Sequence, residues 1–401
     1  MTYNRYTLYS KDLPSSKTEV IKAAQLEILL KLDIETWGPK LARNVLHNDL
    51  SLKKGETVTI EAWTRALPWI DPFVIEARKM GVTPFVMYES ENAFWANVDS
   101  GRAKVLGQLG AQEKAAIRKS DAYIYFWGPA DRARWYRLPK STLDSLTAYE
   151  DEWFKLAKEN KLRWCRIELA RVTEELAKDY RIGYREWTRE LLEASTIDPQ
   201  PMVKKGKLIA ERFENGRRVL ITHRNGTKFE LGLSRRKCYV DDGVITEDDV
   251  EAGFGESTVP SGVVVVAVDE SVAEGRYVSN LPTRLGLAQF KEQSDNGVWN
   301  FQNGRLTSYN YRKGKKSFDR MYAAAGEERD RPGILSIGLN PKIRMAPFFE
   351  DQEYGVVTCY IGANDWLGGT NKGEFKSWMA LRGTDLQVDG EYILKAGKIV
   401  V

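Results

Sequence analysis

Residues 56–88 run in the order strand, helix, glycine and strand, and this order constrains the fold more than any other feature of the sequence. Glu56–Trp63 and Thr83–Tyr88 are rich in β-branched and aromatic residues, which favour strands. Trp69–Met80 carries apolar residues at helical spacing, and Gly81 is a typical helix stop. Because a helical crossover joins parallel strands, this segment predicts a parallel sheet.

The rest of the first half extends this pattern and predicts an open α/β domain over residues 1–195. Two further strands are expected, at Ala122–Trp127 and near Leu162–Ile167. The helix expected first begins at a capping box of Ser16 with Glu19, and its apolar stripe reaches Leu32. Other helices are expected over residues 39–46, 141–159 and 181–195.

The sequence changes character after Pro199-Gln200-Pro201, where glycine-rich turns separate short strand-like segments. A closing hairpin is expected over residues 391–401. The second half therefore predicts a β-rich α+β domain over residues 196–401. Its expected strands are Arg218–Thr222, Lys228–Leu233, Gly262–Val268 and Gly355–Ile361.

Histidine and cysteine are scarce, which limits the chemistry available. His47 and His223 are the two histidines in 401 residues. Since histidine is the commonest transition-metal ligand and general base, a catalytic triad or multi-histidine metal site must use these two. The three cysteines, Cys165, Cys238 and Cys359, lie far apart. This spacing argues against a disulfide framework and a cysteine-rich zinc site.

Charge and hydropathy exclude further classes of partner. The net charge of +4 comes from 60 basic and 56 acidic residues, so the sequence predicts no nucleic-acid partner, which would need a one-sided basic patch. It also predicts no membrane partner, because no run of eighteen apolar residues occurs. The first residues lack a signal-peptide pattern, so a cytoplasmic location is expected. A charged content of 29% would suit a thermostable protein.

Phosphate-loop, GxGxxG, HExxH, GxSxG and CxxC motifs are absent, but another ordered set of segments is present. It consists of Leu52–Val58, Ala66-Leu67-Pro68, Lys79–Pro84, Asn225–Leu231, Asp241–Gly243, Val259–Val263, Ser271–Gly275, Gly338–Pro341 and Val388-Asp389-Gly390. In this order, the segments resemble the thermophilic metallo-aminopeptidase family of the aminopeptidase T type. That superfamily also includes 2,5-dihydroxypyridine dioxygenases.

The resemblance implies a homodimer that encloses a cavity, with a metal site in the C-terminal domain. The family's ligands are two glutamates, two histidines and an aspartate. The matching positions in this chain hold Val263, Ile334, Thr358, Lys376 and Trp378. Valine, isoleucine and tryptophan supply no ligand, and a lysine ammonium repels a cation. We therefore expect a divergent member without the metal ligands and without a cofactor.

Lys376 is the leading catalytic candidate, because its ammonium could replace the charge of the lost metal and polarise a carbonyl. Glu353 could act as general base, and Asn371 could orient the substrate. For each residue the alternative is an ordinary surface, salt-bridge or turn role. The expected substrate-binding residues are Lys342, Arg344, Asn340, Thr358, Asn364, Lys372, Trp366 and Trp378.

Three functions stay open on the sequence. The leading hypothesis is a metal-independent, hydrolase-like enzyme acting on a small amine, amide or heterocycle. The second is a catalytically inactive homologue that serves as a binding or scaffold subunit. The third is a metallo-aminopeptidase with unusual ligands. A small-molecule substrate is the expected partner in the first and third cases.

Overall fold

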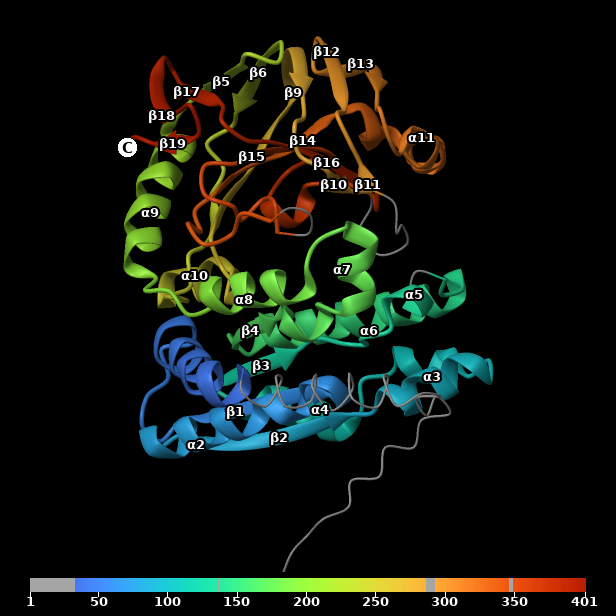
Figure 1. The fold of residues 1–401 in the computed structure, drawn as a ribbon, viewed down its shortest axis with the longest axis vertical. Helices are drawn as coiled ribbons and strands as arrows, with labels where there is room; N and C mark the ends of the chain where they lie inside the picture. Colours follow the sequence, from blue (N-terminus) through green and yellow to red (C-terminus); the bar gives the residue numbers. More distant parts are fainter. Residues whose placement is uncertain (1–32, 136, 286–292, 346–348) are drawn as a thin grey trace, which may run out of the picture.

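The computed structural model describes residues 33–135, 137–285, 293–345 and 349–401. Its N-terminal part is built on a five-stranded sheet of order β2-β1-β3-β4-β8 in which every pair is parallel. Figure 1 places this sheet in the lower half of the molecule. The strands are β1 (Thr57–Trp63), β2 (Thr83–Glu89), β3 (Ala122–Phe126), β4 (Arg163–Ile167) and β8 (Glu256–Val259).

Helices cover both faces of this sheet. One face buries Ile60, Ile124 and Cys165 against α2 and the segment before β1. The opposite face buries Tyr123 and Trp164 against α4 and α6. The helices are α2 (Ile70–Met80), α3 (Glu91–Asp99), α4 (Ala111–Lys119), α5 (Arg132–Trp135), α6 (Lys140–Glu159), α7 (Glu174–Tyr180) and α8 (Tyr184–Ala194). Short helical turns are η1 (Asn44–Asp49), η2 (Thr64–Trp69), η3 (Ala103–Gly107) and η4 (Glu168–Arg171).

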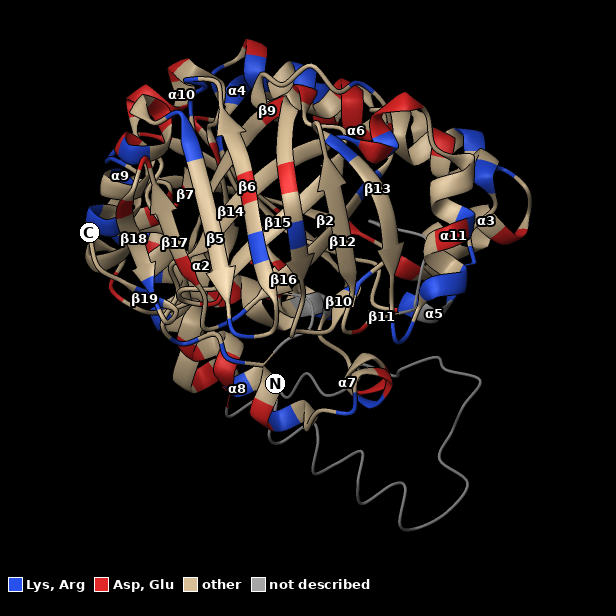
Figure 2. Ribbon diagram, turned by 90° about the horizontal axis from the view of Figure 1, so that it is seen from above, with Lys and Arg blue, Asp and Glu red and all other residues tan. Residues whose placement is uncertain are grey.

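The C-terminal part is a twelve-stranded sheet that curls around its own core, with the principal order β16-β15-β14-β9-β6-β5-β17-β18-β19. Figure 2 shows β5, β6, β9 and β12 side by side, with Lys, Arg, Asp and Glu interspersed along the ribbon. The strands are β5 (Arg218–His223), β6 (Thr227–Leu233), β7 (Tyr239–Asp241), β9 (Val263–Val278), β12 (Val298–Gln302), β13 (Arg305–Asn310), β14 (Pro332–Gly338), β15 (Val357–Gly362), β16 (Lys376–Leu381), β17 (Asp385–Val388), β18 (Glu391–Lys395) and β19 (Lys398–Ile399).

The remaining elements fill the interior of this sheet and its edges. In α9, Ile209 and Phe213 are buried in the same cluster as Val264 and Val266 of β9, so the helix closes the hydrophobic core. The elements are α9 (Gln200–Asn215), α10 (Glu247–Ala252), α11 (Lys315–Ala324), β10 (Thr283–Arg284), β11 (Gln293–Ser294), η5 (Glu327–Asp330) and η6 (Asp365–Leu367).

The predicted fold class is confirmed, a parallel α/β part followed by a β-rich part. The helix expected at Ser16–Leu32 lies outside the described residues. The helix expected over residues 181–195 is α8, and Arg181 instead caps α7 with a left-handed backbone. The domain limits 1–195 and 196–401 stay a prediction, and β8 shows that one segment of the second half joins the N-terminal sheet. In the described residues, no helix is long and apolar enough to cross a membrane.

Candidate functional site

Four adjacent strands bring the predicted ligand positions to one face of the C-terminal sheet. Across β16, β15 and β14, Trp378 pairs with Tyr360, which pairs with Ile334. Val263 begins β9, beside Gly338 at the end of β14. Because side chains alternate along a strand, these residues face away from the main core, whereas Leu335 and its neighbours enter it. We call this surface the site face.

Lys376 lies at one end of the site face, as the first residue of β16. Its Nζ is 5.6 Å from the centre of the Trp366 ring, close enough for a cation–π contact. Its side chain is half-buried, and burial lowers the pKa of Lys376 while nearby Asp365 partly offsets that effect. Lys376 and Trp378 point to the same side of β16, so the predicted ammonium borders the aromatic part of the face.

The centre of the site face is a stacked pair of aromatic rings, each hydrogen-bonded to a carboxylate. Tyr360 and Trp378 lie 5.7 Å apart between ring centres, with 30° between their planes. Trp378 donates from Nε1 to Glu350 Oε1 at 2.9 Å. The Tyr360 hydroxyl donates to Asp351 Oδ2 at 3.2 Å. Both carboxylates come from one short segment, so the loop after β14 brings two acids to the aromatic pair.

Asp351 has the electrostatics expected of a proton-transfer group. Burial raises the pKa of Asp351 to about 6, and the negative charge of Glu350 adds to the rise. The Tyr360 hydrogen bond and the guanidinium of Arg284 oppose this shift. Arg284 also lies 5.9 Å from the Trp378 ring centre. A carboxyl that titrates near neutral pH can both accept and donate a proton under physiological conditions.

Ser336 and Thr358 place two hydroxyl groups beside this centre. They pair across β14 and β15 and are fully buried. The Thr358 hydroxyl oxygen has no hydrogen-bond partner within the part of the chain that the structure describes, whereas the Ser336 hydroxyl lies beside the Tyr360 hydroxyl. Leaving such a group unsatisfied costs about 1–3 kcal/mol. Thr358, a predicted substrate-binding residue, lies on the site face but is fully buried, so its role stays a prediction.

The structure does not place Glu353 near Lys376. Both carboxylate oxygens of Glu353 accept hydrogen bonds from Arg382, each at 2.6 Å. Burial raises the pKa of Glu353, and Arg382 opposes the rise. Arg382 follows the end of β16, whereas Lys376 begins it. At about 3.3 Å per residue, the two ends lie roughly 20 Å apart. The expected catalytic trio is therefore not assembled, and buried Glu353 forms an ion pair with the exposed Arg382 instead.

The three predicted asparagines hold loops together. Asn371 donates to the carbonyl oxygens of Pro332 and Gly362, at 3.1 and 3.0 Å. Asn364 donates to Glu270 and to a backbone carbonyl, and its own oxygen accepts from the Asn371 backbone. Asn340 donates to the backbone of residues 194 and 261. These amides have no donor left for a substrate, which identifies them as structural anchors near the site.

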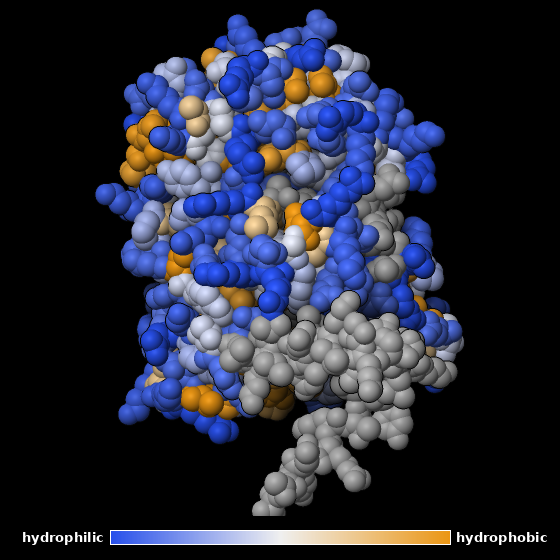
Figure 3. All heavy atoms as spheres, viewed as in Figure 1, coloured by the Kyte–Doolittle hydropathy of each residue, from blue (hydrophilic) through white to orange (hydrophobic). Residues whose placement is uncertain are grey.

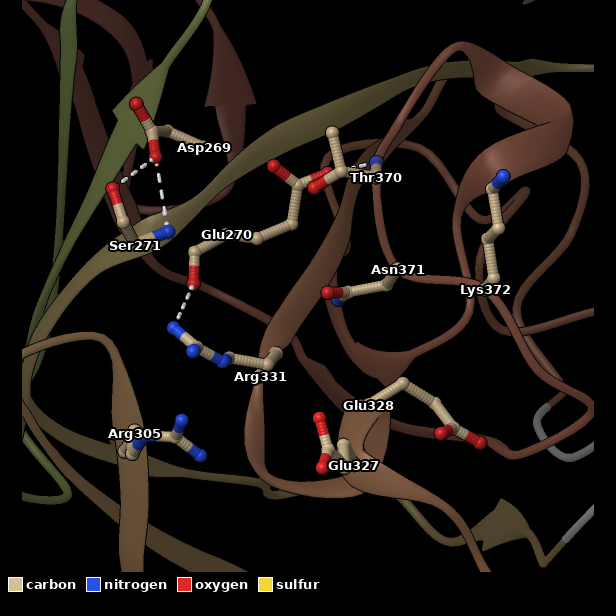
Figure 4. A pocket seen from close by; sticks show the side chains of 10 residues that line it. All are labelled: Asp269, Glu270, Ser271, Arg305, Glu327, Glu328, Arg331, Thr370, Asn371 and Lys372. Carbon is tan, nitrogen blue, oxygen red and sulfur yellow. Dashed lines mark hydrogen bonds between the residues drawn. The ribbon is translucent and has the colours of Figure 1, made fainter.

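A polar pocket of about 530 Å³ adjoins the Lys376 end of the sheet. Figure 4 shows Asn371 and Lys372 among its lining residues, together with Glu270 and Arg331. Glu270 is buried. Burial would raise the pKa of Glu270, but hydrogen bonds from Arg236, the Thr370 backbone and Asn364 outweigh it and lower the pKa to about 2. This carboxylate is therefore a fixed anion and a structural support of the pocket.

The other predicted substrate-binding residues are open to solvent. Lys342, Arg344 and Lys372 are exposed, and 45% of the Trp366 surface is accessible. On the side of the molecule that Figure 3 shows, apolar residues reach the surface in small separate groups. Sequence reasoning missed Tyr360, Asp351 and Arg284. Strand alternation could have identified Tyr360, since Tyr360 lies two residues beyond Thr358 on the same face of the strand. Asp351 and Arg284 belong to no periodic pattern in the sequence.

The donor set of the site face does not fit a divalent metal. Val263 and Ile334 are buried apolar residues, and the Trp378 indole nitrogen is a donor already bonded to Glu350. Lys376 adds a positive charge to the same face of the sheet, which would repel a metal cation. Throughout the described ranges, no three histidine, cysteine, aspartate or glutamate side chains are grouped closely enough to hold a metal ion.

Two solved structures share this fold. Wild-type AmpT from Thermus thermophilus matches with a TM-score of 0.67 and 16% identity over 92% of this chain and 100% of that one. The 2,5-dihydroxypyridine dioxygenase from Pseudomonas putida KT2440 matches with a TM-score of 0.58 and 13% identity, over 91% and 97% of the two chains. No protein-family model matches the sequence, and neither does any curated protein. At these identities the likeness concerns the fold, which agrees with the predicted resemblance.

Proposed function

We propose that this protein is a metal-independent, hydrolase-like enzyme that acts on a small amide, amine or heterocycle at the site face. The observation that carries the proposal is Asp351. Its carboxyl titrates near neutral pH, contacts the Tyr360 hydroxyl and lies beside an arginine. A general acid–base residue needs this combination of matched pKa and fixed orientation.

The arrangement supports hydrolysis of a carbon–nitrogen bond. Ionised Asp351 would take a proton from water as the water oxygen attacks the carbonyl carbon. The negative charge that develops on the carbonyl oxygen would be stabilised by Lys376 or Arg284. The carbon–nitrogen bond then breaks, and Asp351 returns the proton to the leaving nitrogen. The buried hydroxyls of Ser336 and Thr358 are additional donors on the same face.

Metal independence in this proposal rests on residue identity. The positions that match the family's ligands hold Val263, Ile334, Thr358, Lys376 and Trp378, which offer an ammonium and apolar surface where a cation would need anions. Tyr360, on the same face, has a pKa well above its ordinary value, chiefly through burial and then through Asp351, so it stays a neutral donor.

The test is turnover of a panel of small aryl amides and N-acyl heterocycles by protein treated with chelator. We expect activity that increases as pH rises through about 6 and that Asp351→Asn lowers by about 100-fold or more. Asp319→Asn, on the exposed surface of α11, is the matched control and should leave the rate unchanged. Equal activity of the two variants would remove Asp351 from the mechanism.

The same assay separates the alternative functions. Restoration of turnover by added zinc, cobalt, manganese or iron would favour a metallo-aminopeptidase with unusual ligands. Binding of panel compounds without turnover, measured by calorimetry, would favour an inactive homologue that serves as a binding subunit.

A further inference from the structure

A second cavity lies in the N-terminal domain, far in sequence from the site face. Its volume is about 310 Å³, within the range of small-molecule sites. It is formed where β1, β2, β3 and β4 end, with residues of α3, η3 and α6 on the other side. In open α/β sheets, ligands bind in the crevice beyond the carboxyl ends of the strands. The position of the cavity therefore matches the general rule for this architecture.

Aromatic side chains dominate the wall of this cavity. Nine aromatic residues line it, and five of them are tryptophans, namely Trp63, Trp127, Trp135, Trp153 and Trp164. The faces of aromatic rings carry negative electrostatic potential and attract cations. The molecule already shows this behaviour, since the Arg132 guanidinium lies 4.9 Å from the Trp127 ring centre and 5.1 Å from that of Trp135.

The cavity also holds carboxylates without cationic partners. Glu61, Glu89 and Glu113 line it, and none forms an ion pair with a lysine or arginine within the described part of the chain. Glu61 is 8% exposed and accepts a hydrogen bond from Tyr123, and Glu113 accepts one from Tyr149 at 2.7 Å. The one arginine of the lining, Arg166, is 2.8 Å from Glu168, so its charge is already opposed. The wall therefore has an excess of negative charge.

The titration of Glu61 is consistent with this excess. Burial raises the pKa of Glu61 to about 7, and the charges of Glu113 and Glu89 add to the rise while Tyr123 opposes it. A bound cation would oppose the same repulsion and favour the ionised carboxylate. The charged and titratable groups that surround Glu61 in the cavity wall and the packed elements are Glu89, Glu113, Glu150, Tyr123, Tyr125, Tyr149 and Arg166.

Two indole nitrogens in the wall are buried, and that of Trp63 lies beside the Tyr125 hydroxyl, whereas that of Trp135 lacks a partner among the described residues. The indole nitrogen of Trp135 is buried and forms no hydrogen bond to any residue that the structure describes. An unsatisfied N–H in such a place favours a ligand with an acceptor atom. The wall therefore favours a ligand with a positive charge, which the rings and carboxylates attract, and with an oxygen that can accept a hydrogen bond from the indole.

We propose that this cavity binds a small organic cation, such as a quaternary or protonated amine, that also carries an acceptor oxygen. The ring faces and Glu61 hold the cationic head, and Trp135 donates to the oxygen. This site is separate from the proposed hydrolytic site, so either assignment can fail without the other.

The test compares choline with its neutral carbon isostere, 3,3-dimethyl-1-butanol, by isothermal titration calorimetry on the full chain. We expect choline to bind at least about tenfold more tightly at pH 8, with an affinity that falls as pH drops below 7 and Glu61 becomes protonated. Equal affinity for the two probes, or no binding of choline, acetylcholine or tetramethylammonium at about 10 mM, would overturn the proposal.

Two variants and one control assign the contacts. Glu61→Gln should weaken choline binding by about tenfold and abolish its pH dependence. Trp135→Phe keeps a ring but removes the N–H, so it should weaken choline and leave tetramethylammonium unchanged. Glu159→Gln, at the exposed end of α6, should change neither. Thermal melting checks that each variant is folded. Equal losses for both probes in Trp135→Phe would refute the acceptor part of the proposal.

Discussion

The carboxylate of Glu270 allows one prediction to be worked out from the structure. It forms two hydrogen bonds with the Arg236 guanidinium, at 2.7 and 2.8 Å. It also accepts from the Thr370 backbone at 2.6 Å and from Asn364 at 2.8 Å. These bonds fix the loop that follows β15, which carries several predicted site residues. Replacing Glu270 by glutamine removes the charge while it keeps the size of the side chain.

The expected cost follows from the pKa. The folded value of about 2 lies roughly 2.5 units below the ordinary value of 4.5. At about 1.4 kcal/mol for each pH unit between the two values, the ionised carboxylate contributes about 3.5 kcal/mol of folding free energy at neutral pH. Because the folded pKa is depressed, this contribution is complete above about pH 5 and is lost as pH falls through 2. Glu270→Gln should therefore lose stability at pH 7 and lose progressively less in acid.

The assay is urea denaturation of both proteins at several pH values between 3 and 7. Hydrogen exchange of the peptide covering residues 363–375 provides a local measure, because a global unfolding transition need not report on one loop. Glu327→Gln is the matched control, because Glu327 lines the same pocket but is exposed. A loss in Glu270→Gln that stays below about 1 kcal/mol, or that does not shrink between pH 5 and pH 3, would refute the reasoning.

Further outcomes can be measured separately. Burial, and then the charge of Asp241, raises the pKa of Asp49 well above its usual range, so the folded state loses stability as pH rises. Asp49→Asn should therefore stabilise the protein more at pH 8 than at pH 5. An equal gain in stability at both pH values would contradict this. Gly338→Ala should lower the melting temperature, because the new Cβ would lie 2.0 Å from the Glu353 carbonyl oxygen. The expected loss of stability is about 1–3 kcal/mol. An unchanged melting temperature would count against this prediction. Elemental analysis after mild chelation should find far less than one zinc, cobalt, manganese or iron per chain. Light scattering at micromolar concentration should give twice the chain mass, and a monomer mass would reject the predicted dimer.

Local patterns were sufficient for the elements of residues 56–88 and for the fold class. The strand, helix, glycine and strand of residues 56–88 follow from short-range propensity, and the structure forms β1, α2 and β2 there, with Gly81 in a left-handed conformation. Alternation along a strand also determines which residues share a face. The predicted ligand positions came from the family resemblance, and the pairing of β14, β15 and β16 brings those on these strands to one surface.

Only the tertiary structure decided which polar groups meet. Glu353 was expected beside Lys376, but its carboxylate accepts hydrogen bonds from Arg382 instead. Sequence spacing contains no information on which cation a carboxylate will meet. Asp351 reaches Tyr360 from a loop. The tryptophans of the N-terminal cavity come from β1, α5, α6, β4 and the end of β3, so nothing in their order along the chain predicts a common wall. Long-range packing sets these contacts, because side-chain neighbours across a fold depend on the path of the whole backbone.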